Sequence, residues 1–352
     1  MKLRPVFFAA FLLIFSSLAC RFAERMLTNP TPTPPPTATA LPPTETPAPP
    51  SPTPQPTFND SCPDGNCVEA CLANLGALSK TAPSENHDGF NNAEYDLVTY
   101  EISGDEISNP VKQPVSSGLK PFQQDEASQR RMWDYFAAII PAESRQGLAR
   151  YIIFSDGEAN ILASVAQSDF DANLWVLRVD IVDAADPKEL TYTLVHEYAH
   201  LLTLNPSQVP PSLPIFNHPE NGNVYEQEAA KCETYFPGEG CSKPDSYINQ
   251  FTETFWSSIY DEWSQIDNIG DEQEYYDALD AFYQKHQSEF VSDYAPTNPA
   301  EDIAESFSYF VLTPRPAGDT IADKKLLFFY GYPELAALRL KMIEGICSYE
   351  GK

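Results

Sequence analysis

The stretch DPKELTYTLVHEYAHLLT, residues 186–203 of the 352-residue chain, is the most informative local pattern in the sequence. Asp186 is a favoured helix N-cap, Pro187 suits the first helical position, and Glu189 adds a capping-box carboxylate. The helix that these residues predict runs to about Thr203 and ends before the next proline. An apolar run before it has the composition of a strand, so the sequence predicts a strand followed by a helix here.

Within this predicted helix, His196 and His200 are four residues apart, so their side chains leave the same face one turn apart. Two imidazole nitrogens placed in this way can bind one Zn²⁺ at about 2.0–2.1 Å each. Glu197 can then accept a proton from a water molecule whose pKa the metal lowers to about 7. The alternative is a pair of surface histidines beside a solvated glutamate. That alternative requires two of only five histidines to have this spacing by chance.

A catalytic zinc needs a third protein ligand and one open coordination position. The best candidate is Glu301, because Glu305 follows one turn later on the same face of a predicted helix, 299–312. One carboxylate can bind the metal while the other accepts the ring N–H of a ligand histidine. Asn298 also makes Glu301 a plausible capping-box residue, so capping alone is an alternative explanation for that glutamate.

The segment at 196–200 and the downstream pattern Tyr-x-x-Thr-x-x-x-Glu-x-x-Ala-Glu-x-Phe at 294–307 resemble the anthrax-lethal-factor-like branch of the gluzincin metallopeptidases. The resemblance covers only these two short blocks, and the first is shared by many zincins. The order of the predicted elements indicates an α+β protein, with a mixed sheet-and-helix lobe that carries the histidines and a mainly helical C-terminal lobe, and the resemblance implies a zincin-like fold. It also implies the following roles: one Zn²⁺ bound by His196, His200 and Glu301, general base Glu197, Glu305 accepting a ligand-histidine N–H, and Tyr294 donating a hydrogen bond to the oxyanion.

The chain departs from the branch in one respect, because His200 and Glu301 are separated by 101 residues (200 to 301), a longer gap than the resemblance leads us to expect. The insertion at about 205–290 either shapes a substrate cleft or hides a nearer ligand. Glu226 and Glu228 are the reserve candidates for that ligand. His218, in a proline- and asparagine-rich stretch, is expected at the surface.

The N-terminus predicts export. A short basic start and an apolar run form a secretory signal peptide over residues 1–20, too short for a comfortable membrane span. The ending Leu-Ala-Cys20 resembles a bacterial lipobox, which implies a lipidated Cys20 and a membrane-tethered protein. Ser17 stands where lipoboxes usually have Leu, so ordinary signal-peptide cleavage with free secretion and an uncleaved anchor are the alternatives. Residues 21–58 are mainly Pro and Thr and predict a disordered, extended stalk.

The remaining cysteines fit an oxidising compartment, because their number is even. Cys232 and Cys241 flank Gly-Glu-Gly and predict a short closed loop. The cluster formed by Cys62, Cys67 and Cys71 cannot pair entirely within itself, and Cys347 is a candidate for the remaining bond. A metal site at this cluster is a weaker alternative, because no histidine or second cysteine pair completes it.

Periodicity predicts strands at 95–102, 151–154, 161–166 and 174–182, and helices at 125–140, 251–266, 271–294, 299–312 and two further stretches toward the C-terminus. The predicted folded domain is 59–352, with lobes at roughly 90–204 and 205–352. Aromatic residues between 251 and 294 are expected mainly in the core. A formal charge of −28 disfavours nucleic acid and anionic lipid as ligands.

The sequence therefore predicts an extracytoplasmic zinc endopeptidase that acts on peptides or proteins and meets the membrane only through an N-terminal lipid anchor. The alternative is a surface-displayed binding lipoprotein that keeps the fold and the metal but has little turnover. Hydrolysis of a non-peptide substrate is a weaker third hypothesis, because nothing in the sequence favours it.

Overall fold

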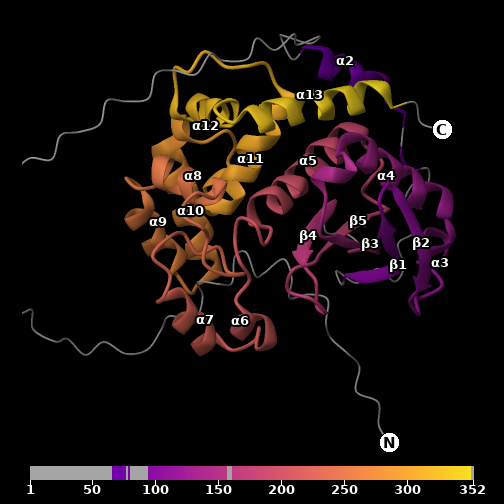
Figure 1. Cartoon of the computed structure of the whole chain (residues 1–352), viewed down its shortest axis with the longest axis horizontal. Helices are drawn as coiled ribbons and strands as arrows, with labels where there is room; N and C mark the ends of the chain where they lie inside the picture. The colour runs from indigo at the N-terminus through magenta and orange to yellow at the C-terminus, as the bar shows by residue number, and fades with distance from the viewer. Residues whose placement is uncertain (1–65, 77, 80–93, 157–160, 350–352) are drawn as a thin grey trace, which may run out of the picture.

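The computed structural model describes residues 66–76, 78–79, 94–156 and 161–349. The predicted signal peptide and stalk, together with Cys20 and Cys62, lie outside the described residues. The described part is a mixed α/β structure: a five-stranded sheet lies beside a larger set of helices, most of them C-terminal (Figure 1). This agrees with the predicted α+β class at that level.

The sheet has the strand order β2-β1-β3-β5-β4, and only β3 and β5 are parallel neighbours. The strands are β1 (Tyr95–Ser103), β2 (Glu106–Lys112), β3 (Leu148–Ser155), β4 (Ala163–Gln167) and β5 (Trp175–Asp180). Every residue of β5 is buried, including the charged Arg178 and Asp180. At one edge of the sheet, β4 pairs with no described strand except β5, and α5 also contacts β4.

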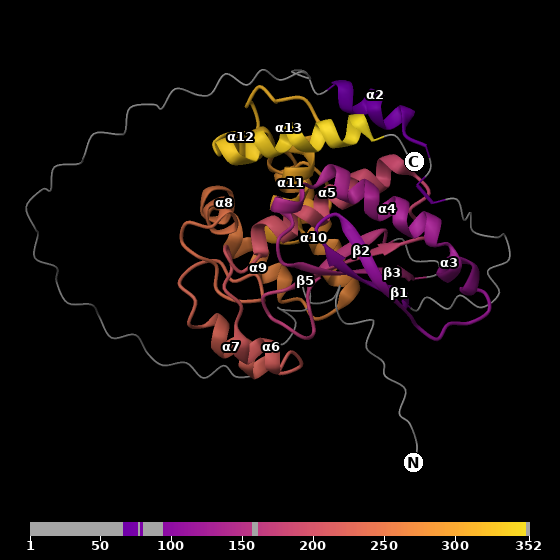
Figure 2. The same cartoon turned by 45° about the vertical axis from the view of Figure 1, so that its right-hand side comes forward.

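The helices of the N-terminal half are α2 (Asn66–Asn74), α3 (Lys120–Gln124), α4 (Glu126–Ile139) and α5 (Pro187–Leu204). On the sheet, α4 packs through Trp133 against Tyr151 of β3, with ring centroids 5.4 Å apart. A hydrogen bond of 2.6 Å between Tyr135 Oη of α4 and Thr191 Oγ1 of α5 joins these two helices. Both views place α5 between the sheet and the C-terminal helices (Figures 1 and 2).

The C-terminal helices are α6 (Leu213–Asn217), α7 (Gly222–Ala229), α8 (Tyr247–Phe255), α9 (Tyr260–Asp267), α10 (Glu272–His286), α11 (Pro299–Leu312), α12 (Ile321–Tyr330) and α13 (Pro333–Ser348). Along α5 lies α11, which is the contact that brings the two predicted sequence blocks together. At the end of the chain, α13 returns to pack on α4 and α2. Gly345 permits that approach, since a Cβ there would lie 2.0 Å from the Ala138 carbonyl oxygen.

Disulfides join Cys71 to Cys347 and Cys232 to Cys241, and Cys67 is disulfide-bonded as well. The predicted short loop and the predicted long-range bond are therefore both present. The Cys71–Cys347 bond ties α2 to α13, so α2 belongs to the folded part. Disulfides persist in oxidising compartments, which favours a location outside the cytoplasm.

Two helix predictions are wrong in their extent. The stretch 251–266 is not one helix, because the chain leaves helical hydrogen bonding between α8 and α9 at residues 256–259. Trp256 lies at this break, fully buried, and its indole N–H donates to Asp302 Oδ2 at 2.7 Å. The stretch 271–294 is helical only to His286, and the chain then continues through short 3-10 turns toward Tyr294.

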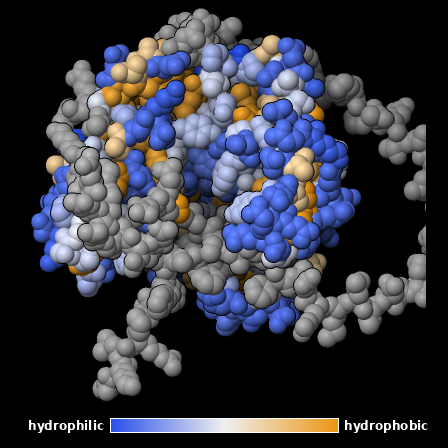
Figure 3. Space-filling model, turned by 180° about the vertical axis from the view of Figure 1, so that it is seen from behind, coloured by the Kyte–Doolittle hydropathy of each residue, from blue (hydrophilic) through white to orange (hydrophobic). Residues whose placement is uncertain are grey.

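The aromatic residues of the C-terminal helices mainly form core, as expected. Phe251, Trp263, Phe282 and Phe290 are buried, whereas Tyr276 is exposed. The face seen from behind is largely hydrophilic with scattered apolar residues, in keeping with a strongly acidic chain (Figure 3). Within the described ranges, no helix combines the length and apolar character that a membrane span requires.

Candidate metal centre

The first element of the site is α5, whose start the sequence predicts correctly. Asp186 Oδ1 accepts hydrogen bonds from the backbone N–H groups of Lys188 at 2.8 Å and Glu189 at 3.3 Å. These bonds satisfy donors that the first helical turn leaves without partners. Eleven residues of the helix are buried, and the two histidines are among them. The apolar flanks of α5 therefore fix the rotation that turns His196 and His200 toward α11.

The second element is α11, and its start is also capped. Asn298 Oδ1 accepts from the backbone N–H groups of Ala300 at 2.9 Å and Glu301 at 3.0 Å. Capping thus uses the backbone of Glu301, while its carboxylate is turned toward α5. The neighbouring acid, Asp302, is fully buried and forms an ion pair of 2.6 Å with Lys325. This pair anchors the first turn of α11 to α12.

Three potential ligand atoms converge between the two helices. His196 Nε2 lies 3.1 Å from Glu301 Oε2 and 3.1 Å from His200 Nε2, and His200 Nε2 lies 3.3 Å from the same carboxylate oxygen. In a tetrahedral site with bonds of about 2.0–2.1 Å, neighbouring ligand atoms are about 3.3–3.4 Å apart. The triangle therefore has nearly the size that one tetrahedral ion requires.

The protonation of this triangle supports the same interpretation. Glu305 Oε1 lies 2.8 Å from His196 Nδ1, which favours the tautomer with a proton on Nδ1 and a lone pair on Nε2. The Nε2 atom then faces a carboxylate, which only accepts. The His196 Nε2 lone pair and the Glu301 carboxylate are then two acceptors in contact, which need a cation or an added proton between them. The buried group His196, His200 and Glu301 can accordingly hold a metal ion.

Electrostatics show how strongly the centre favours positive charge. Burial lowers the pKa of His196, but hydrogen bonds to Glu301 and Glu305 outweigh it and raise that pKa to about 10. Burial raises the pKa of Glu301, but the charge of His200 and hydrogen bonds from both histidines outweigh it and hold that pKa far below its usual range. A divalent ion can replace the protons that this arrangement attracts.

Glu197 lies beside the triangle and is held by the sheet. Its Oε2 accepts the backbone N–H of Val165 in the edge strand β4 at 2.7 Å. Burial raises the pKa of Glu197, and the positive charges of His196 and His200 oppose that rise. Burial therefore desolvates the carboxylate, although the residue as a whole is not fully buried. These are suitable conditions for a general base.

Tyr294 reaches the centre from the segment before α11. Its ring centroid is 6.1 Å from that of His196, and 51% of the residue is exposed. The negative charge of Glu301 raises the pKa of the phenol most, and burial and Glu197 add to the effect. The hydroxyl therefore stays protonated and remains a hydrogen-bond donor at an accessible position.

Sequence reasoning missed the residues that hold Glu305. Ser292 Oγ donates to Glu305 Oε2 at 2.5 Å and accepts the backbone N–H of Ala295 at 3.1 Å. The Tyr192 phenol interacts with the same carboxylate. Tyr192 lies one helical turn before His196, so its position on that face of α5 was detectable from spacing. Nothing in the sequence distinguished Ser292.

A second missed residue is Glu239, in the loop closed by the Cys232–Cys241 disulfide. Burial raises the pKa of Glu239 to about 6, and the charge of His200 opposes this rise. Glu239 Oε2 and His200 Nδ1 are both buried without a hydrogen-bond partner. Gly240 fixes the loop, since a Cβ there would lie 2.1 Å from the Pro210 carbonyl oxygen.

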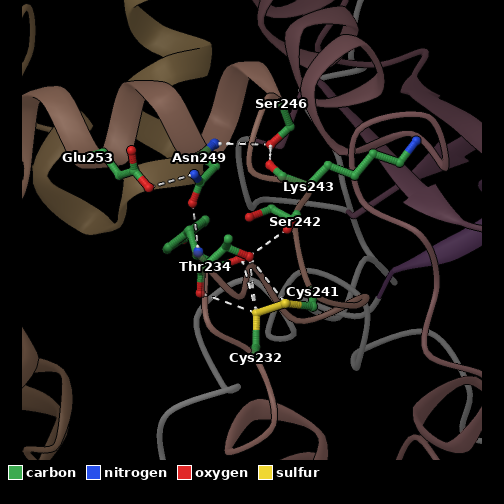
Figure 4. Close-up of a disulfide and its surroundings, with 9 residues drawn as sticks. Cys232, Thr234, Cys241, Ser242, Lys243, Ser246, Asn249 and Glu253 are labelled. Carbon is green, nitrogen blue, oxygen red and sulfur yellow. Dashed lines mark hydrogen bonds between the residues drawn. A yellow bond between two sulfur atoms is a disulfide. The ribbon is translucent and has the colours of Figure 1, made fainter. Parts of the chain in front are cut away.

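Hydrogen bonds anchor this disulfide loop to α8 (Figure 4). The Thr234 hydroxyl donates to the Ser242 carbonyl oxygen at 2.5 Å, which bridges the two sides of the loop. Asn249 of α8 accepts the backbone N–H of Tyr235 at 3.0 Å, and its amide donates to Glu253 at 2.8 Å. The insertion thus packs a rigid loop beside the metal centre.

The reserve candidates do not join the His pair. Glu228 accepts from Ser212 Oγ at 3.0 Å and pairs with Lys231, while Glu226 is exposed. His218 is exposed, as expected. Of the described carboxylates, Glu301 is the one grouped with both histidines.

Comparisons of the chain with models of protein families, with curated proteins and with solved structures give no match.

Proposed function

We propose that this protein is a zinc-dependent endopeptidase with a zincin-like fold. The observation that carries the proposal is the triangle of His196 Nε2, His200 Nε2 and Glu301 Oε2, with edges of 3.1–3.3 Å. Two imidazoles and one carboxylate form the donor set of catalytic rather than structural zinc sites, because they leave a fourth position for water or substrate. The histidine spacing around Glu197 supports the same assignment.

In this proposal each protein group has a separate task. A zinc ion held by the triangle supplies Lewis acidity, which lowers the pKa of water to about 7 and polarises a carbonyl group. Glu197 accepts the proton of the attacking water. The Tyr294 phenol donates a hydrogen bond to the oxyanion that develops on the scissile carbonyl. Glu305 holds the His196 ring by accepting its Nδ1–H.

The edge strand β4 supports a peptide as the substrate. The Val165 N–H points away from β5 and bonds to Glu197, so the outer side of β4 borders the general base. An extended peptide can add to such an edge through backbone hydrogen bonds, which would bring its carbonyl groups past the catalytic side chains. A substrate without a peptide backbone could not pair with this strand edge in the same way.

We further propose that the enzyme acts outside the cytoplasm, tethered to the membrane by a lipid on Cys20. The disulfides Cys71–Cys347 and Cys232–Cys241 support an oxidising location. The Pro- and Thr-rich segment 21–58 suits a spacer that separates the catalytic domain from the membrane.

The test is cleavage of casein and of a mixed peptide library by the zinc-loaded full-length protein and its Glu197→Gln variant. Both proteins are expected to bind one zinc per chain. Loss of a general base costs about 10²–10⁴-fold in rate, so the variant should be nearly inactive. Glu226→Gln, the same change at an exposed site, should retain full activity.

Two results would count against the proposal. Full activity in zinc-loaded Glu197→Gln would remove the assigned general base. Tight zinc binding without any peptide cleavage by the wild-type chain would instead favour a binding lipoprotein that keeps the metal.

A further inference from the structure

A second group of acidic side chains lies near the start of α5, away from the histidines. Asp156 directly follows β3, Asp180 ends β5, and Asp183 lies in the turn that leads to α5. Because β3 and β5 are parallel, their carboxyl ends meet at the same end of the sheet. The three residues, here called the acidic trio, can each offer a carboxylate oxygen such that all three lie within 4.8 Å of one another.

Backbone donors satisfy only part of the acidic trio. Asp180 accepts N–H bonds from Asp156 at 2.9 Å and from Val182 at 2.6 Å. Asp156 Oδ2 accepts the Ile161 N–H at 3.0 Å. Two further atoms, Asp156 Oδ1 and Asp183 Oδ2, are buried and accept no hydrogen bond. Asp156 is only 3% exposed, so its unpartnered oxygen is shielded from bulk water. Buried acceptors of this kind need an explanation.

The charge of the acidic trio is also uncompensated. No lysine, arginine or histidine in the described ranges forms an ion pair with any of the three carboxylates. Arg178 interacts electrostatically with Asp180, but its guanidinium is paired with Glu94 and Asp96. Like charges this close in a buried site are unfavourable unless they gain protons or a cation.

The protonation equilibria agree with this charge imbalance. Burial raises the pKa of Asp180 to about 7, with the charges of Asp183 and Asp156 adding to the effect. Burial likewise raises the pKa of Asp183 to about 6, with the charges of Asp156 and Glu189 adding. At neutral pH the trio therefore lies near the point at which it must either hold a proton or bind a positive ion.

We propose that the acidic trio binds Ca²⁺. All the available ligand atoms are oxygens, which hard cations prefer and which make a poor zinc site. Ca²⁺ accepts irregular sets of 6–8 oxygens at about 2.3–2.6 Å, whereas Mg²⁺ demands a near-ideal octahedron. The ends of β3 and β5 and the turn before α5 offer an irregular set of oxygens, which suits Ca²⁺ better than Mg²⁺.

The bound ion joins the ends of β3 and β5 to the turn that precedes α5. The Ser79 hydroxyl donates to the Ile181 carbonyl oxygen of the same turn at 2.9 Å, so the N-terminal segment is fastened there too. Calcium therefore stabilises the connection from which the histidine-bearing helix starts. The proposal does not depend on peptidase activity, since none of its ligands belongs to the metal centre.

The experiment is calcium titration of the full-length, calcium-depleted protein by calorimetry, together with thermal unfolding with and without calcium. The wild type should bind one Ca²⁺ per chain with a Kd of about 10⁻³ M or lower, the range of extracellular sites. Its Tm should rise with calcium concentration. Asp183→Asn removes one carboxylate with little change in shape and should weaken binding by about tenfold or more, since ligand charge tunes affinity.

Two controls locate the site. Asp280→Asn makes the same charge change on the exposed face of α10 and should leave calcium affinity unaltered. His196→Ala should also leave it unaltered, because His196 belongs to the other centre. Asp156→Asn provides a second variant at the trio, should Asp183→Asn fail to fold. Absence of calcium binding by the wild type at millimolar concentration overturns the proposal, and so does wild-type affinity in either folded variant.

Discussion

Loss of Glu305 should weaken zinc binding even though this residue is not one of the three ligands. Glu305 accepts from His196 Nδ1 at 2.8 Å and from Ser292 Oγ at 2.5 Å, and it interacts with the Tyr192 phenol. Removing a carboxylate that orients a ligand histidine typically lowers metal affinity by 10–100-fold, which corresponds to about 1.4–2.8 kcal/mol. We expect Glu305→Gln and Glu305→Ala to fall at opposite ends of this range.

Glu305→Gln keeps an amide oxygen that can still accept the His196 Nδ1–H but removes the negative charge. We expect zinc affinity to fall by about tenfold, the lower limit. Glu305→Ala leaves the histidine, the serine and the tyrosine without their shared acceptor, and we expect a loss of about 100-fold. Both variants should retain the triangle of ligands and still bind zinc at saturation.

The assay is competition for Zn²⁺ with a chromogenic chelator of known affinity at neutral pH, which gives Kd directly. Glu226→Gln provides the matched control, because it makes the same change at an exposed glutamate outside the metal centre. Wild-type zinc affinity in Glu305→Ala would refute the argument that Glu305 fixes the tautomer and orientation of His196.

Three further predictions concern stability. Replacing both Cys71 and Cys347 by Ser should lower the free energy of unfolding by about 2–5 kcal/mol in denaturant titrations, because the bond spans 276 residues; an unchanged midpoint would contradict this. Lys325→Met should cost about 3–5 kcal/mol in the same assay, since it leaves the Asp302 carboxylate buried without its cationic partner; a neutral effect would mean that Asp302 is uncharged. The folded state raises the pKa of Asp180 to about 7, so it holds a proton that the unfolded chain releases near pH 4. The stability of the calcium-depleted wild type relative to Asp180→Asn should therefore fall as pH rises from 6 to 8, and calcium should restore it; a pH-independent difference in Tm would contradict the assignment.

The parts of the site that were predictable from sequence are those set by local chemistry. The cap formed by Asp186 and Pro187, the spacing of the histidines and the cap at Asn298 each depend on residues within one helical turn. Such signals fix where α5 and α11 begin and which side chains share a face. Helix spacing made Glu301 the best candidate for the third ligand, and the resemblance of two short blocks supported this pairing across a gap of 101 residues.

The parts that escaped prediction depend on contacts between distant segments. The break after α8 occurs where Trp256 turns inward to donate to Asp302, a residue far along the chain. The strand β2 was missed because most of its residues are exposed and it contains Pro110, so it lacks the apolar alternation that marks a strand. Glu239 comes near His200 because the Cys232–Cys241 disulfide and the close contact at Gly240 fold the insertion back. Residue spacing in the sequence does not predict the shape of this loop.

The most direct test of the central claim is X-ray diffraction from crystals of the zinc-loaded full-length protein, recorded on both sides of the zinc absorption edge. The account predicts one strong anomalous peak between α5 and α11, at about 2.0–2.2 Å from His196 Nε2, His200 Nε2 and a Glu301 carboxylate oxygen. Zinc found elsewhere, or bound by the histidines with Glu301 turned away, would contradict it.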